Sequence, residues 1–391
     1  MKTRRICVIT GSRAEYGHML MLMKAIEADR GLRLQVVVTG MHLSSAFGHT
    51  FRVIEKDGFS IDARLPILKF DNTPEGICRS IGLGTALIAR SLGKLKPDIV
   101  VICGDRYEML AAATAAHVLG IPIAHLHGGE NSEGAIDEAF RHAITKMSSL
   151  HFAATEPYRR RIIQMGEQPS RVFNFGAPGQ DLILNTPVMG REDLARALGF
   201  DLTGPVALVT FHPVTLEKNS VEEQVKAVTV ALVSSGLRGI ITRSNADQGG
   251  ARINALMETF CLRHPRRFRL FSNLGAKIYF NCLRYADLLV GNSSSGIVEA
   301  PTFRLPVVNI GDRQQARVRS SNVIDVACES AAIKKGISQA LSPAFKRSLK
   351  GMRNPYGSGS DGKVSERIKD VLKSAEIGGK LLKKKFYNIK F

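Results

Sequence analysis

Short apolar runs rich in β-branched residues recur along the chain, and each ends in glycine or in polar residues. In the first half of the chain they occupy residues 6–10, 34–40, 98–105 and 121–129. Helix-like stretches separate them, for example residues 107–119. Because consecutive positions of each run are apolar, the pattern is typical of parallel strands that helices cover on both faces. It predicts a doubly wound α/β domain.

The same alternation resumes after a polar stretch at residues 185–193. Its apolar runs occupy residues 205–213, 239–244, 287–296 and 305–312. We therefore predict an α/β protein of two doubly wound, Rossmann-like domains, residues 1–184 and 185–362. In open parallel sheets ligands bind outside the carboxyl ends of the strands, so the active site is expected in the cleft between the two domains.

A terminal helix is predicted at residues 363–377. Its apolar residues recur at helical spacing, and Ser365 or Asp361 is placed to cap its start: Val364, Ile368, Val371 and Leu372. The last residues, 378–391, form a basic run that we interpret as a solvated tail.

The length of 391 residues suits two domains of ordinary size. The net charge of +19, from 54 Lys and Arg against 35 Asp and Glu, would attract a polyanion or a phosphorylated small molecule. The basic residues are spread along the chain, and no nucleic-acid recognition module accompanies them. We therefore predict a small-molecule partner and no nucleic acid.

The lengths of the apolar runs and the spacing of the cysteines both fit a cytoplasmic protein without a membrane span. No apolar run reaches the roughly 18 residues that a membrane span requires, so no membrane partner is predicted. The six cysteines include no C-x-x-C pair, which indicates neither a zinc knuckle nor a disulfide framework. We expect a cytoplasmic protein.

The segment GNSSSGIVEAP follows a strand and leads into a helix, which predicts a phosphate site. Ser293, Ser294, Ser295 and Gly296 would offer hydroxyl and backbone N–H groups at the helix N-terminus. Glu299, one turn later, could accept hydrogen bonds from a ribose. The alternative is an ordinary serine-rich helix cap.

Ionisable residues gather where two strands of the first domain end. Asp105 and Glu130 follow these strands, and Asp137, Glu138 and Arg141 lie on the next predicted helix. At spacings of three and four, Glu138 faces Arg141 and His142, and Asp137 faces Arg141. Carboxylates crowded beside a cation can have divergent pKa values, which lets one act as a base and another as an acid.

Several basic side chains are further candidates. His125 and His127 share one face of a strand, which suggests a metal-hydrolase site, but packing inside the domain is the interpretation we favour for His125. His212 follows a strand of the second domain and could be an acid-base group or a phosphate ligand. Arg13 and Arg313 also follow strands, from where their guanidinium groups could reach a diphosphate.

An ordered series of segments resembles the UDP-N-acetylglucosamine 2-epimerase family, specifically its hydrolysing branch: GSRAEYG, TGMHLSSAFG, GDRYE, HGGE, IDEAFRHAITK, FHPVT, SNAD, GNSSSGIVEAP and GDRQQARVR. That branch supplies N-acetylmannosamine-type sugars for sialic and legionaminic acid synthesis. The resemblance implies the two-domain GT-B fold, a last helix that crosses back to the first domain, and a homodimer or homotetramer. It also implies a UDP-sugar substrate.

By this resemblance the reaction uses no nicotinamide and no metal, so no cofactor is expected. A base removes the proton on the carbon that bears the acetamido group, and UDP leaves the neighbouring anomeric carbon by anti elimination. Water then adds to the resulting glycal, and the configuration at the acetamido-bearing carbon is inverted.

The resemblance also implies roles for individual residues. It assigns proton transfer to Asp105, Glu130, Asp137 and Glu138, with Arg141 orienting them and His212 as a further candidate. It assigns the UDP-sugar to Arg13, His212, Asn245, Ser293, Ser294, Ser295, Gly296, Glu299 and Arg313. Two residues depart from relatives: Glu15 stands where some have Asp, and His127 where several have Glu.

The substrate stays open at this point. We favour UDP-N-acetylglucosamine, and the alternative is UDP-2,4-diacetamido-2,4,6-trideoxyglucose, also called UDP-N,N'-diacetylbacillosamine. From other classes, a glycosyltransferase of the same fold and a nucleic-acid-binding protein are the remaining hypotheses.

Overall fold

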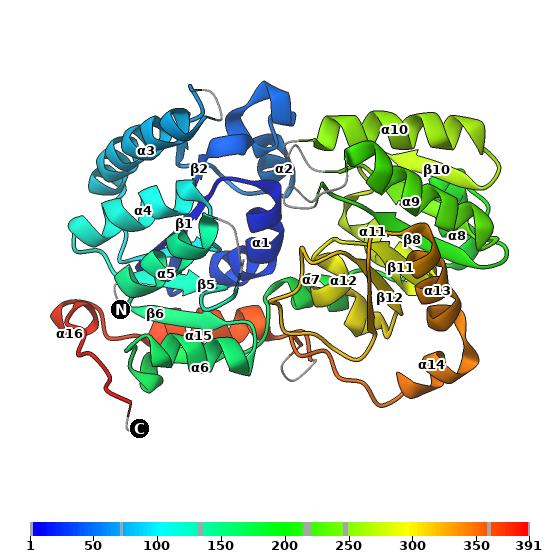
Figure 1. Cartoon of the computed structure of the whole chain (residues 1–391). Helices are drawn as coiled ribbons and strands as arrows, with labels where there is room; N and C mark the ends of the chain where they lie inside the picture. Colours follow the sequence, from blue (N-terminus) through cyan, green and yellow to red (C-terminus); the bar gives the residue numbers. More distant parts are fainter. Residues whose placement is uncertain are drawn as a thin grey trace. The chain divides into compact units, whose positions relative to one another are not determined.

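The computed structural model describes residues 3–70, 73–131, 136–213, 220–244, 249–357 and 361–389 (Figure 1). The chain divides into two compact units, which we call unit 1 (Met1–Leu184 with Tyr356–Phe391) and unit 2 (Asn185–Pro355). Each unit contains one parallel sheet with helices on its faces. The predicted α/β class with two doubly wound domains is confirmed.

Within the described residues, the sheet of unit 1 has seven strands in the order β3-β2-β1-β4-β5-β6-β7. Every pairing is parallel. The chain begins in the middle of the sheet and winds outward in both directions, so a topological switch point lies between β1 and β4. The strands are β1 (Arg4–Thr10), β2 (Leu32–Thr39), β3 (Ala63–Leu65), β4 (Ile99–Cys103), β5 (Ile123–Leu126), β6 (Leu150–Ala153) and β7 (Val172–Asn174).

The part of unit 2 that is described has a six-stranded parallel sheet in the order β10-β9-β8-β11-β12-β13. Its switch point lies between β8 and β11. The strands are β8 (Val206–Thr210), β9 (Arg238–Thr242), β10 (Phe268–Phe271), β11 (Leu288–Gly291), β12 (Val307–Ile310) and β13 (Val323–Val326).

The sequence pattern predicted only some of the helices. Those of unit 1 are α1 (Arg13–Ala28), α2 (Phe51–Lys56), α3 (Pro74–Leu95), α4 (Tyr107–Val118), α5 (Asp137–Met147), α6 (Glu156–Gln164), α7 (Gly179–Asn185, which leads into unit 2), α15 (Val364–Ser374) and α16 (Gly379–Leu382). Those of unit 2 are α8 (Arg191–Leu198), α9 (Val221–Ser234), α10 (Gly250–Arg263), α11 (Gly275–Tyr285), α12 (Ser295–Val298), α13 (Ser330–Leu341) and α14 (Pro343–Ser348). Short 3-10 turns are η1 (Gly40–Leu43), η2 (Ser45–Phe47), η3 (Pro169–Arg171) and η4 (Ala300–Phe303).

Both faces of β1 are buried, which explains its unbroken apolar sequence. Ile6 and Val8 pack in a cluster with side chains of α1 and α15. Cys7 and Ile9, on the opposite face, pack in a second cluster with side chains of α3 and α4. A sheet covered in this way exposes its ligand-binding edge only at the strand ends, as expected for a doubly wound fold.

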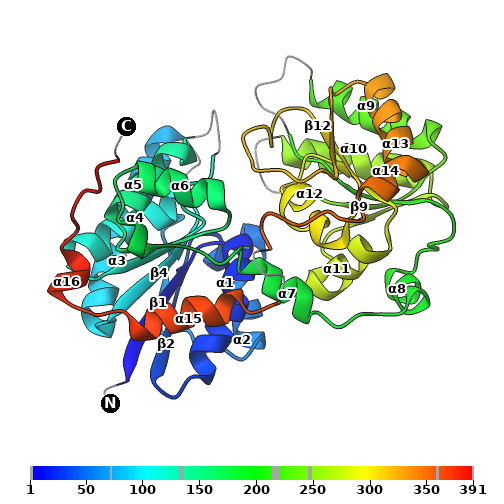
Figure 2. The ribbon, with the colours of Figure 1, turned by 90° about the horizontal axis from the view of Figure 1, so that it is seen from below.

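The terminal helix α15 lies beside α1 in unit 1 (Figure 2). Its cap differs from the prediction. Asp181 of α7, far away in the sequence, accepts hydrogen bonds from the backbone N–H groups of Val364 (3.0 Å) and Ser365 (2.6 Å). Asp361 instead bonds the N–H of Lys363 and pairs with Arg367, so neither Ser365 nor Asp361 caps the helix.

The predicted solvated tail is also wrong for part of its length. Residues of α16 form a helical turn in which Leu381 is buried in the core of unit 1. Lys384 forms an ion pair with the buried carboxylate of Glu167. Favourable contacts of this kind outweigh the hydration of an exposed basic segment.

We expect Asp181→Ala to lower the free energy of unfolding by about 1–2 kcal/mol, because the first turn of α15 loses its cap. Urea unfolding measures the change. Asp370→Ala, which removes an exposed carboxylate from the same helix, is the control and should shift it by less than about 0.5 kcal/mol. Equal effects of the two substitutions would contradict the capping role.

Candidate active site

Arg141 is the centre of a buried ion cluster at the carboxyl edge of the unit 1 sheet. It lies on α5 with only 3% of its surface exposed. Its guanidinium donates to the carboxylate of Asp105, which follows β4, and lies 3.5 Å from Glu130, which follows β5. It also donates to the carbonyl oxygen of His127 (3.1 Å). One cation thus joins two strand ends to one helix.

His127 belongs to the same cluster. Its Nδ1 lies 2.7 Å from Oε1 of Glu130, and both side chains are buried. Its backbone has a φ of +62°, the left-handed region that L-residues rarely adopt. Nε2 has no hydrogen-bond partner in the described part of the chain. A strained histidine oriented by a carboxylate is a common feature of acid-base sites. The sequence marked His127 as a departure from relatives and, with His125, as part of a possible metal site, but not as the partner of Glu130.

His125 packs inside unit 1, as the interpretation we favoured requires. Its Nε2 lies 2.8 Å from the carbonyl oxygen of Gly104, and its Nδ1 lies 3.2 Å from the hydroxyl of Thr145. Burial lowers the pKa of His125 to about 3, so the ring is neutral. Because both ring nitrogens are engaged, His125 is a poor metal ligand, which removes support for the metal-hydrolase hypothesis.

The first turn of α5 carries the other predicted carboxylates. Glu138 pairs with His142 (3.2 Å), as the spacing predicted. Asp137 is half-buried, and this burial, together with the charge of Asp105, raises the pKa of its carboxyl group. The guanidinium of Arg141 points to Asp105 and Glu130, which follow strands, rather than along the surface of its own helix.

A second charged cluster lies at the switch point between β1 and β4, and the sequence did not reveal it. Arg106 binds the fully buried Glu108 through two hydrogen bonds of 3.0 and 3.1 Å. It also lies 3.9 Å from the buried Glu15. One oxygen of Glu15, Oε2, accepts the N–H of Gly11 (2.7 Å), and the other, which faces Arg106, has no hydrogen-bond partner among the described residues.

Burial and the charge of Glu108 raise the pKa of Glu15 to about 8, although Arg106 and the Gly11 N–H oppose the shift. Glu15 is therefore mostly protonated at neutral pH, whereas its neighbour Glu108 holds the Arg106 ion pair. In the sequence this second cluster was represented only by an acidic residue after each of two adjacent strands, Glu15 after β1 and Glu108 after β4.

In unit 2, Asn292 joins the segments that follow three strands. Its side chain accepts the N–H of His212 (2.7 Å), after β8, and donates to the carbonyl oxygen of the same residue (2.9 Å). Its own carbonyl oxygen accepts from Arg313 (3.1 Å) and Gln314 (3.0 Å), after β12. Asn292 is fully buried and was not predicted. It places His212 and Arg313 at one edge of the sheet.

His212 is itself buried, and its Nδ1 lies 3.1 Å from the hydroxyl of Ser244. Gly291, just before Asn292, has a φ of +142°, and an added Cβ would lie 1.9 Å from the carbonyl oxygen of Thr210. Only glycine permits β11 to end so close to β8. This close approach brings the serine segment beside His212.

The serine segment forms a shorter helix than the sequence predicted. The helical turn α12 has four residues, with Ser294 as its N-cap, Ser295 and Gly296 inside it and Ser293 just before it. Glu299 accepts the hydroxyl of Ser295, which accepts in turn from Tyr279 (2.6 Å). Burial raises the pKa of Glu299. Glu299 therefore already accepts a hydrogen bond from one hydroxyl group.

Of the remaining predicted residues, Arg13 and Arg313 lie in the described part of the chain and Asn245 does not. Arg13 is exposed at the start of α1, directly after the N-cap Ser12. Arg313 is tied to Asn292 as described. Asn245 lies outside the described residues.

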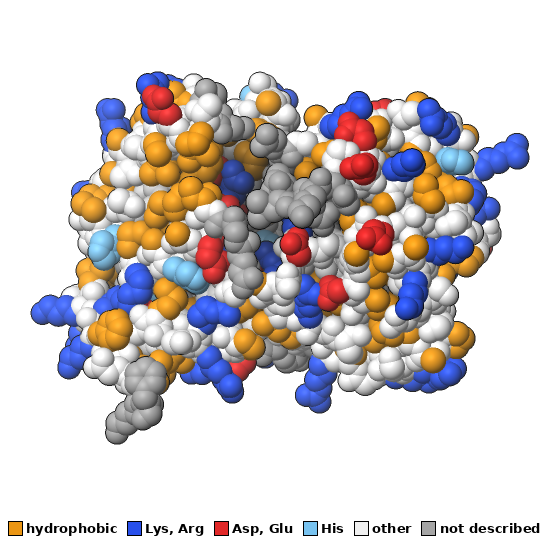
Figure 3. All heavy atoms as spheres, viewed as in Figure 1, with side chains coloured by type: hydrophobic (Ala, Val, Ile, Leu, Met, Phe, Trp, Pro, Cys, Tyr) orange, Lys and Arg blue, Asp and Glu red, His pale blue; other side chains and the backbone are white. Residues whose placement is uncertain are grey.

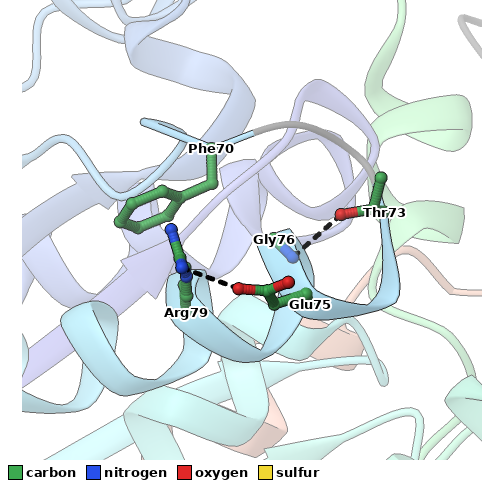
Figure 4. A pocket seen from close by; sticks show the side chains of 5 residues that line it. All are labelled: Phe70, Thr73, Glu75, Gly76 and Arg79. Carbon is green, nitrogen blue, oxygen red and sulfur yellow. Dashed lines mark hydrogen bonds and ion pairs between the residues drawn. The ribbon is translucent and has the colours of Figure 1, made fainter.

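A surface hollow of about 380 Å³ lies at the start of α3, and the described residues that line it belong to none of these clusters (Figure 4). Its lining includes the exposed side chains of Phe70, Glu75 and Arg79, and the last two pair with each other (2.6 Å). Since the described residues that line it include no buried ionisable group, they do not resemble an acid-base site.

The excess of basic residues forms no single patch on the face shown in Figure 3, where Lys and Arg lie scattered among acidic and apolar side chains. The face shown thus offers no single basic patch of the kind by which proteins bind nucleic acid. None of the helices in the described ranges combines the length and the apolar character needed to cross a membrane.

Two doubly wound parallel sheets, each with polar clusters at its switch point, define a two-domain α/β fold of the GT-B-like class. The chain belongs to the UDP-N-acetylglucosamine 2-epimerase family, whose model matches residues 24–373. The resemblance inferred from the ordered segments is confirmed.

Two relatives and one solved structure illustrate the similarity. The chain is 40% identical to a GDP/UDP-N,N'-diacetylbacillosamine 2-epimerase (hydrolyzing) of Campylobacter jejuni, over 83% of this chain and 85% of that protein. It is 39% identical to a UDP-N,N'-diacetylbacillosamine 2-epimerase (hydrolyzing) of Legionella pneumophila, over 97% and 98%. The crystal structure of the Neisseria meningitidis UDP-GlcNAc 2-epimerase bound to UDP-GlcNAc matches with a TM-score of 0.81 and 18% identity, over 94% and 99%.

The raised pKa of Glu15 predicts a specific pH dependence of stability. Between about pH 4.5 and pH 8 the folded protein holds a proton on Glu15 that the unfolded chain has released, so stability falls as pH rises. Relative to Glu15→Gln, the wild-type free energy of unfolding should fall by up to about 1.4 kcal/mol per pH unit in this window.

Denaturant unfolding at several pH values measures this slope. Glu27→Gln, which changes an exposed carboxylate on the same helix, is the control and should run parallel to the wild type. A Glu15→Gln curve that also runs parallel to the wild type would show that Glu15 is ionised when folded.

Proposed function

We propose that this protein is a hydrolysing 2-epimerase that acts on UDP-2,4-diacetamido-2,4,6-trideoxyglucose. The support is the identity of 39–40% to two relatives that are named for this sugar nucleotide, one of which is covered almost completely. Our sequence analysis favoured UDP-N-acetylglucosamine, and these relatives favour the alternative. The choice of sugar is part of the proposal, whereas membership of the UDP-sugar 2-epimerase family does not depend on it.

The proposed reaction has two steps. In the first, a base removes the proton on C2, a C1=C2 double bond forms, and the bond between C1 and the diphosphate oxygen breaks to release UDP. In the second, water adds its hydroxyl group to C1, and a proton is delivered to C2 from the opposite face. The products are UDP and a free sugar with inverted configuration at C2.

The observation that carries this proposal is the cluster around Arg141. Proton transfer to and from carbon needs at least two groups whose protonation differs, placed close together. The cluster supplies the carboxyl groups of Asp105 and Glu130 and the imidazole of His127. Burial and the charge of Asp105 raise the pKa of Asp137, which favours the protonated form of this nearby carboxyl group.

Within this set we assign His127 and Glu130 to act together. Glu130 accepts the Nδ1–H of His127, a tautomer that the hydrogen-bond network implies, and this leaves Nε2 to exchange a proton. Arg141 fixes Asp105 and the backbone of His127 at once. Glu138, paired with His142, adds a second carboxylate–imidazole pair on α5.

The carboxyl edge of the unit 2 sheet is assigned to UDP. His212 and Arg313, positioned by Asn292, would stabilise the negative charge on the departing diphosphate. The hydroxyl and N–H groups of Ser293 and Ser294 would bind its phosphates, and Glu299 the ribose. A departing diphosphate gains a negative charge as the bond to C1 breaks, and it leaves faster where fixed cations and N–H donors offset that charge.

The homodimer or homotetramer, the cytoplasmic location and the absence of a cofactor stay predictions of the sequence. A glycosyltransferase of the same fold would use the same UDP groups. It would need no cluster able to remove a proton from carbon, which is why we favour the epimerase.

We expect UDP release to be faster from UDP-2,4-diacetamido-2,4,6-trideoxyglucose than from UDP-N-acetylglucosamine, by at least about tenfold in kcat/KM. The reason is that a pocket that hydrogen-bonds an acetamido group at C4 leaves its polar groups unpaired with a hydroxyl there. A coupled assay for UDP, with no sugar acceptor added, measures both rates. Equal rates, or a preference for UDP-N-acetylglucosamine, would overturn the choice of sugar.

We expect Asp105→Asn to reduce kcat by about 10²–10⁴-fold, because the variant loses a carboxylate of the proton-transfer set. UDP binding by calorimetry should be unchanged, which also shows that the variant is folded. Asp98→Asn is the matched control, because Asp98 lies at the opposite end of the same strand, where it bonds the N–H of Arg5 (2.7 Å). An Asp105→Asn variant within about threefold of the wild type would contradict the assignment.

A further inference from the structure

The basic C-terminal segment is anchored to the helix that carries Arg141. The ammonium group of Lys384 donates to the carbonyl oxygens of Lys146 (2.8 Å) and Ser148 (2.7 Å), at the end of α5. It also lies 2.7 Å from the carboxylate of Glu167. An ammonium has three N–H donors, and all three therefore have an acceptor within unit 1.

Glu167 is a buried anion that needs these cations. It lies 2.6 Å from the ammonium of Lys146 and 3.0 Å from Nε2 of His151, on β6. Burial raises the pKa of Glu167, but the hydrogen bonds from His151, Lys146 and Lys384 outweigh it and lower the value to about 2. The carboxylate is thus ionised, and removal of one cation leaves it undercompensated.

Backbone and aromatic contacts hold the segment on both sides of Lys384. The N–H of Tyr387 donates to the carbonyl oxygen of Gly166 (2.9 Å), and Phe386 lies so close to Gly166 that an added Cβ would be 2.4 Å from its ring. Arg171 donates to the carbonyl oxygens of Lys380 (2.6 Å) and Leu381 (2.8 Å). In Figures 1 and 2 the segment runs beside α5 and α6.

The location of Lys384 matters because α5 is short. It spans eleven residues, with Asp137 and Glu138 in its first turn and Arg141 in its second. Its last carbonyl groups have no partners inside the helix, and the helix dipole favours a cation there. Lys384 satisfies both requirements from a segment more than two hundred residues away.

We propose that Lys384 is a positioning residue, which holds the C-terminal end of α5 so that Arg141 and the acidic residues of its first turns keep their places in the acid-base cluster. This inference rests on the proposed function, because it takes the α5 residues as parts of the reaction. A displacement of about 1 Å in a proton-transfer group can cost up to about a hundredfold in rate. Binding of UDP, assigned to the unit 2 edge, should not depend on Lys384.

The test compares Lys384→Met with Lys384→Arg and with Lys385→Met. Lys385 is the exposed neighbour and serves as the matched control. We expect Lys384→Met to lower kcat for UDP release by about tenfold with KM changed less than about twofold, since positioning acts on the reaction rather than on binding. Lys384→Arg should recover most of the rate, and Lys385→Met should equal the wild type.

Amide hydrogen exchange provides a readout that needs no activity. In Lys384→Met the amides of α5 should exchange faster than in the wild type, with those of the unit 2 sheet unchanged. If Lys384→Met does not fold, Lys384→Gln, which keeps N–H donors and loses the charge, should change kcat and exchange in the same direction.

The outcomes separate the two proposals. A wild-type protein that releases no UDP from either sugar overturns the proposed function. An active wild type with Lys384→Met at the wild-type rate and wild-type α5 exchange overturns the positioning role. A loss of rate that Lys384→Arg does not restore, or that Lys385→Met reproduces, also overturns it.

Discussion

The burial of the Arg141 guanidinium is the interaction on which the candidate active site depends. A buried cation costs several kcal/mol unless anions and carbonyl oxygens compensate it. Here they come from two neighbouring strand ends, Asp105 after β4 and Glu130 with the His127 carbonyl after β5. Because one cation binds them all, both loops and α5 are fixed relative to one another. The candidate acid-base groups of unit 1 thus lie together because neighbouring parallel strands end at the same edge of the sheet.

The same helix connects this edge to the C-terminal segment. Arg141 holds α5 to the strand ends, and Lys384 binds the carbonyl groups at its other end. The charge of Lys384 is compensated by Glu167, which is ionised although buried. Glu15 shows the opposite outcome, since its burial and the charge of Glu108 outweigh Arg106 and the Gly11 N–H and raise its pKa to about 8. The cations and hydrogen-bond donors around these two buried acids thus offset burial to different extents.

The sequence predicted what depends on local pattern. Runs apolar on both faces indicated β1, β2, β4, β5, β8, β9, β11 and β12. They did not indicate short strands such as β3, which is half-exposed, or β6, where His151 interrupts the apolar pattern. Helical spacing found the Glu138–His142 pair and missed the partners of Arg141, which lie on other elements. Asp181, Asn292 and Lys384 escaped notice for the same reason, because each acts on residues distant in the sequence.

The central claim is that the unit 1 cluster moves a proton at C2 of a UDP-sugar while UDP departs. Proton NMR of the free sugar formed in D2O tests it most directly, with the preferred UDP-sugar as substrate. The account predicts that every product molecule carries deuterium at C2, has the manno configuration there and is formed together with one UDP. A product that keeps its original hydrogen at C2, or its original configuration, would contradict the account.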